Sequence, residues 1–137
     1  MKDIILVGDK GFYSSNNAKE LETKGIRYIL PLKRNSQFID YSPLKQAGRK
    51  QFDGHFLFEN RVILHYERVL EGKRIVTFLD NFLKVEEERD FLIRINEGKL
   101  KIEEFHENEN KFGAISIITG VDLPPQRIFE LLKSRVD

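Results

Sequence analysis

The chain has 137 residues, of which 40% are hydrophobic and 33% charged, and its formal net charge is +1. This composition is that of an ordinary globular domain and excludes a disordered chain, and the lack of cysteine excludes disulfides and thiolate metal sites. The lack of cysteine also indicates a reducing compartment, and no apolar run approaches the roughly 20 residues of a membrane span. We therefore expect a cytoplasmic protein.

Charge is distributed unevenly along the chain. Residues 33–50 contain five basic side chains and one acidic one, whereas residues 86–110 contain nine acidic and four basic ones. Such an asymmetry can orient a domain on an anionic polymer. Two solvated surfaces that differ in charge would give the same pattern, and the sequence leaves both interpretations open.

The beginning of the chain predicts a strand, a helix and a second strand. Residues 4–7 are continuously apolar, which is typical of a strand buried on both faces. A serine N-cap precedes a helix expected over residues 16–24, and residues 27–30 form the next strand. Strands joined in this way pair in parallel as a βαβ unit. Asp9 then lies at the carboxyl end of the first strand, the edge where ligands bind in α/β sheets.

The middle of the chain is rich in strand signals. Residues 33–48 have the composition of a loop with one short helical piece. Apolar residues alternate on both sides of Glu59-Asn60, which predicts a hairpin, and Glu71-Gly72 predicts a second turn. A third strand is expected over residues 74–79.

A helix capped by Asp80 or Asn81 is expected next. Its buried side would carry four apolar residues and its outer side three glutamates: Leu83, Phe91, Leu92 and Ile95 inside, and Glu86, Glu87 and Glu88 outside. Residues 99–111 are polar and predict a connector with a short strand around residues 101–102. A strand between two glycines at residues 113–120 and a helix opened by Pro124-Pro125 complete an α/β (α+β) chain.

Asp9 is the first candidate for chemistry. It stands in a Gly-Asp-Lys-Gly run directly after an apolar strand, where its carboxylate can serve as a hard oxygen ligand for Mg²⁺ or Mn²⁺. A two-metal site for phosphodiester chemistry needs additional carboxylates to hold both ions. From the pattern alone a strand-terminal turn without chemistry is the simpler explanation, since aspartate and glycine are common in turns.

Several stretches of the sequence resemble one known family. The similar residues are Asp9 to Ser14, Asn17, Leu21, Gly25, Tyr28-Ile29 and Pro31 to Ser36. They resemble the block around the second catalytic aspartate of the bacterial and archaeal DDE insertion-sequence transposases that carry a Tyr-Arg-Glu signature. The similarity continues in order through Asn60 to Ile63, Phe78-Leu79-Asp80, Thr119-Gly120 and Phe129 to Arg135.

The resemblance implies an RNase H-like core with three metal-binding carboxylates, of which Asp9 is the second. It implies one partial catalytic domain over residues 1–137, divided into three parts: a βαβ unit at 1–36, a β-rich and helical insertion at 50–111, and a strand with the start of the catalytic helix at 112–137. The family cuts DNA at element ends with metal-activated water and joins the freed 3′-hydroxyl to a target. The implied partner is DNA, the cofactor of the complete domain Mg²⁺ or Mn²⁺, and the location the prokaryotic cytoplasm with its nucleoid.

Four further residues are candidates for contact with DNA. Lys33, Arg34 and Asn35 follow the second strand and would touch phosphates, while Arg135 would orient a carboxylate or a phosphate through its planar fork. An exposed basic loop and a surface helical arginine are the alternatives.

The chain also departs from the family's pattern. Leu132 stands where the signature tyrosine is expected, and the first aspartate and the glutamate would lie outside the chain. We therefore expect a truncated, catalytically incomplete transposase fragment that does not bind the metal tightly. Two other interpretations stay open, namely a non-enzymatic DNA-binding remnant and a fragment that forms homo-oligomers through an open sheet edge.

Overall fold

The computed structural model describes residues 4–45 and 51–134. Its strands are β1 Ile5–Val7, β2 Arg27–Pro31, β3 Gly54–Phe58, β4 Arg61–Leu70, β5 Lys73–Asp80 and β6 Ala114–Thr119, and its helices are α1 Ser15–Thr23, α2 Ser42–Lys45, α3 Asn81–Asn96, α4 Ile102–Asn108 and α5 Pro125–Ser134. The described strands form one mixed sheet in the order β1-β2-β6-β5-β4-β3. The expected α+β fold class is confirmed. No helix in the described ranges is both long and apolar enough to cross a membrane.

The β1–α1–β2 unit has the parallel pairing that the sequence predicts, with Leu6 opposite Tyr28. Ser14 caps α1 by accepting a hydrogen bond from the Asn17 amide at 3.0 Å, and Gly25 follows the helix with a φ of +70°. The expectation that β1 is buried on both faces is wrong. β1 is an edge strand in the described sheet, and Leu6 is 36% exposed on one of its faces while Ile5 and Val7 on the other face are only half-buried.

Both predicted turns are confirmed by the backbone. Glu59 and Asn60 connect β3 to β4 with φ values of 49° and 66°, and Glu71 connects β4 to β5 with a φ of 53°. Positive φ at both central residues matches the twist of a two-residue hairpin. These turns lead β5 into the sheet between β4 and β6, with Val76 and Phe78 fully buried.

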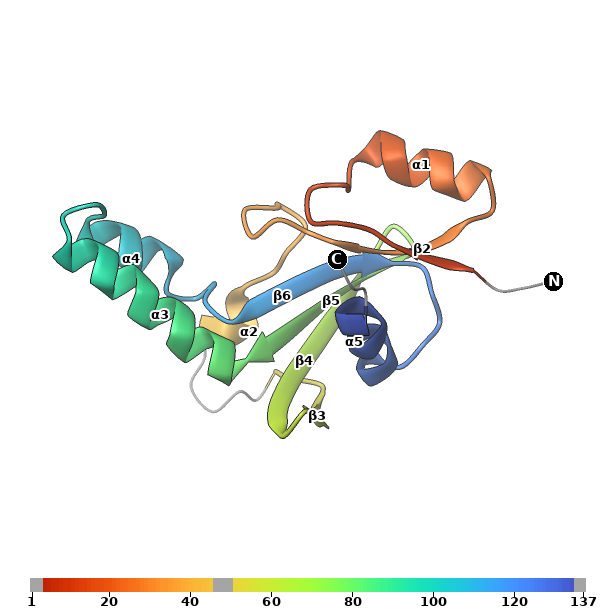
Figure 1. Ribbon diagram of the computed structural model, residues 1–137. Helices are drawn as coiled ribbons and strands as arrows, with labels where there is room; N and C mark the ends of the chain where they lie inside the picture. The colour runs from red at the N-terminus through yellow and green to blue at the C-terminus, as the bar shows by residue number, and fades with distance from the viewer. Residues whose placement is uncertain (1–3, 46–50, 135–137) are drawn as a thin grey trace.

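Helices cover the sheet from both sides (Figure 1). On one side α5 buries Phe129, whose ring packs against Phe78 at a centroid distance of 4.9 Å and belongs to a cluster with Ile117. On the other side α1 contributes Ala18 to a cluster with Ile118 and the loop after β2. The sheet thus has two apolar clusters, one per face, as expected for a layered fold.

The α3–α4 pair differs from the sequence expectation. Residues 102–108 form helix α4 in place of a connector with a short strand. The rings of Phe91, Phe105 and Phe112 contact one another at centroid distances of 5.5–5.9 Å and hold α3 and α4 together. Leu92, expected inside, is 41% exposed, and no residue of α3 is fully buried. The reason is that the pair projects away from the sheet (Figure 1) and has few neighbours to cover it.

Candidate active site

Asp9 lies in the loop that leaves β1, and this loop is held by hydrogen bonds. The Gly8 amide donates to the Ile29 carbonyl at 3.1 Å, and the Phe12 amide donates to the Asp9 carbonyl at 3.0 Å. The Asn17 side-chain amide donates to the Phe12 carbonyl at 2.6 Å, which ties the loop to the first turn of α1. The loop therefore holds Asp9, an exposed residue, at the carboxyl edge of the parallel β1–β2 pair.

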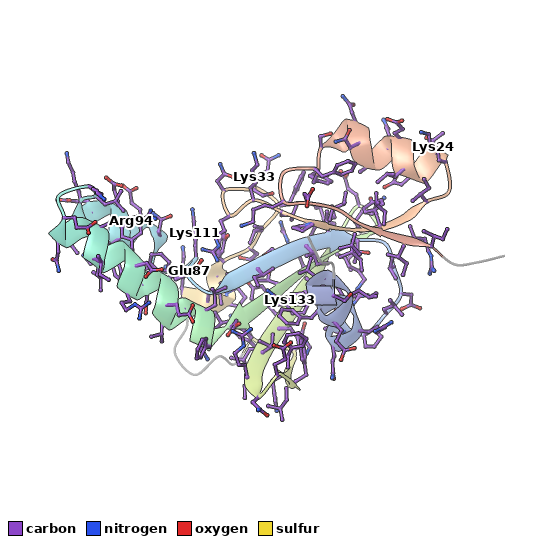
Figure 2. All side chains as sticks on the ribbon, viewed as in Figure 1. Lys24, Lys33, Glu87, Arg94, Lys111 and Lys133 are labelled. Carbon is purple, nitrogen blue, oxygen red and sulfur yellow. The ribbon has the colours of Figure 1, made fainter. Side chains whose placement is uncertain are left out.

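Three lysines lie near the carboxyl ends of β1 and β2, which we call the Asp9 edge. A Cβ added to Gly11 would lie 3.4 Å from Lys33 Cε, so the stem of Lys33 runs along the Asp9 loop. Lys10 and Lys133 line one hollow of about 310 Å³ at the end of β2, the start of β6 and the last turn of α5. Figure 2 shows Lys33 and Lys133 on the two sides of the sheet. The edge that carries Asp9 is therefore rich in ammonium groups.

Arg34 is built into the fold more deeply than the sequence indicates. Its Nε donates to the Ala114 carbonyl at 3.1 Å, and its guanidinium lies 2.9 Å from Glu87 Oε1. The Gly113 amide donates to the same Glu87 oxygen at 2.7 Å. The expectation that Glu87 faces water is wrong, because Glu87 links α3 to the loop after β2 and to the start of β6. Contact between Arg34 and DNA stays a prediction.

Of the two other predicted site residues, the structure describes only Asn35. Asn35 is exposed and lines a hollow together with Lys33. Arg135 lies outside the described residues. Lys10 and Lys133 were not singled out from the sequence, although Lys10 stands within the same run as Asp9. Lys133 has no comparable local signal, since only the packing of α5 brings it to this edge.

The described residues do not assemble a divalent-metal site. None of the groups of three or more His, Cys, Asp or Glu side chains that a metal would need occurs in the described ranges. One carboxylate at Asp9 has the oxygen chemistry that Mg²⁺ prefers but supplies too few of its ligands. Within the described residues, Asp9 is therefore a candidate for one ligand of such a site and not a complete site.

The chain matches a known protein family over all of its residues. The family model described as the transposase DDE domain matches residues 1–137. The chain belongs to this family. Neither the curated proteins nor the solved structures include one that matches the chain. As a transposase DDE domain, the chain is part of a family that acts on DNA and generally uses a divalent metal.

Proposed function

We propose that this transposase DDE domain holds DNA at the edge formed by the Asp9 loop, the end of β2 and the last turn of α5. One observation carries the proposal: Lys10 lies next to Asp9 in its loop, Lys33 runs along this loop, and Lys133 lines the same hollow as Lys10. Lysines in this arrangement neutralise backbone phosphates without reading sequence. Asp9 is the one described residue that we assign to the metal-dependent cleavage and strand transfer of transposition, with its companion ligands outside the described residues.

A salt titration of DNA binding tests the proposal. Fluorescence anisotropy of a labelled duplex should show that the logarithm of the association constant falls linearly with the logarithm of salt concentration. Each of Lys10→Gln, Lys33→Gln and Lys133→Gln should reduce the slope by about 0.9, the value of one phosphate contact on B-DNA. Lys24→Gln is the matched control, since Lys24 pairs with Glu20 on the exposed side of α1 (Figure 2).

Two kinds of result in this salt titration would contradict the proposed interface. Binding that is absent at low salt, or a slope that the three edge variants leave at its original value, would refute the proposed interface. A change with Lys24→Gln as large as that with Lys33→Gln would show a diffuse attraction in place of a defined edge.

A second candidate function, self-association, is favoured by the exposed edge of β1. Strand β1 pairs only with β2 in the described sheet. Ile4, which precedes β1, is 71% exposed, and Leu6 within it is 36% exposed. Open strand edges with apolar side chains recruit further strands. Sedimentation velocity would show a dimer whose population rises with concentration, and a monodisperse monomer at all concentrations would exclude it.

A further inference from the structure

A second hollow lies beside the Asp9 loop, between this loop and the loop after β2. It has a volume of about 310 Å³, and Tyr13, Lys33, Asn35, Gln37 and Phe38 contribute to its walls. Ligand pockets in proteins run from roughly 300 to 1,000 Å³, so this hollow has room for one small planar group. The rings of Tyr13 and Phe38 meet edge to face at a centroid distance of 5.9 Å, which gives the hollow an aromatic wall.

Ser14 and Ser36 on the walls of this hollow accept backbone hydrogen bonds, whereas its two amide side chains are not used by the fold. Asn35 and Gln37 are exposed, and their amides make no hydrogen bond within residues 4–45 and 51–134. By contrast, the Asn17 and Asn108 amides each donate to a backbone carbonyl. Lys33 has no ion pair in the same ranges. Two amides, an ammonium and an aromatic wall are therefore available to one ligand.

These groups match the parts of a nucleotide. Carboxamides of Asn and Gln make paired hydrogen bonds to the N6 and N7 edge of adenine. Aromatic side chains stack on unpaired bases of any sequence, and an ammonium attracts the phosphate. Because the stem of Lys33 runs along Gly11, two residues after Asp9, the phosphate of a nucleotide in this hollow would lie on the edge assigned to DNA.

We propose that this hollow binds one unpaired nucleotide of a DNA strand, with adenine preferred. The base lies against Tyr13 and Phe38, Asn35 and Gln37 read its edge, and Lys33 binds its phosphate. The proposal rests on the DNA-binding function proposed above and adds a base preference to a face that otherwise contacts only phosphates.

The experiment compares single-stranded oligodeoxyadenylate with oligodeoxythymidylate of equal length, both fluorescein-labelled, on the whole chain. The adenylate should bind at least about fivefold more tightly, the lower end for one paired amide–adenine contact. The double variant Asn35→Ala, Gln37→Ala should remove this preference and leave the salt slope unchanged. Lys33→Gln should lower the slope by about 0.7, the single-strand value, and keep the preference.

Gln126→Ala, an exposed amide at the start of α5, is the matched control and should behave as the wild type. Equal affinity for the two oligonucleotides, or a preference that survives the double variant, overturns the nucleotide site and leaves the DNA-binding edge intact. Absence of binding to single strands and duplex alike at low salt overturns the DNA-binding edge itself, and the nucleotide site with it.

Discussion

Glu87 joins three segments that are far apart in the sequence. Its Oε1 accepts hydrogen bonds from Arg34 at 2.9 Å and from the buried Gly113 amide at 2.7 Å. Glu87→Ala should lower the free energy of unfolding by about 1–3 kcal/mol, because it leaves the Gly113 N–H without a partner. Urea denaturation measures this loss. The neighbour Glu86 is exposed, and Glu86→Ala should stay within about 0.5 kcal/mol of the wild type; equal losses in both variants would contradict the assignment.

Glu67 and Arg74 form a second link, and it depends on pH. The hydrogen bonds from Arg74, at 2.8 and 2.9 Å, lower the pKa of the Glu67 carboxyl, while burial opposes this shift. A carboxyl whose pKa is depressed by folding adds stability above its unfolded pKa of about 4.3, and this stability is lost as the pH falls through the folded pKa. The free energy of unfolding, measured by urea denaturation at a series of pH values, should therefore fall less on acidification in Glu67→Gln than in the wild type. Glu107→Gln, which removes a carboxylate from the exposed side of α4, is the control for the loss of one negative charge.

At the scale of elements, the start of β6 depends on a glycine. Gly113 has a φ of +76°, and a Cβ added there would lie 2.6 Å from the Asp80 carbonyl and 2.6 Å from Lys84 Cβ. Gly113→Ala should therefore lower the free energy of unfolding by more than the roughly 1–2 kcal/mol that a left-handed backbone costs an alanine, since the start of α3 must also shift. Gly98 has a similar φ of +77° but open space around it. Gly98→Ala is thus the control in urea denaturation, and a loss as large as that of Gly113→Ala would show that the close contact adds nothing.

Elements with local signals could be predicted from the sequence, and those that depend on distant contacts could not. Ser14 and Gly25 mark the ends of α1, and Glu59-Asn60 marks the hairpin, because capping and turn chemistry act over a few residues. Helix α4 differs from the prediction because its packing depends on Phe105, which contacts the ring of Phe91 in α3 and the ring of Phe112 in the turn before β6. The position of Asp9 after β1 follows from the local sequence pattern. The proximity of Lys133 to Lys10 arises only from the packing of α5 in the folded molecule.

At the scale of the whole molecule, the described residues bring cations to the Asp9 edge without a cluster of metal ligands. The purified chain should therefore bind DNA but show no Mg²⁺-dependent nicking of a supercoiled plasmid above the level of a metal-free control. Gel electrophoresis of the plasmid measures this. Robust nicking that disappears in Asp9→Asn would show that residues outside the described ranges complete the site within this chain.

Arg74 also determines how helix α5 is placed, and α5 carries Lys133. Besides Glu67, the Arg74 guanidinium donates to the carbonyls of Val121 and Leu123 at 2.8 and 2.7 Å, just before α5 begins. Helix α5 has 10 residues, a length of about 15 Å at 1.5 Å per residue. A tilt of about 5° at its first turn would move its last turn by about 1.3 Å over that length. Arg74 thus fixes the start of the helix whose last turn carries Lys133, and a change at Arg74 should shift Lys133 relative to Lys10 across the hollow that both residues line.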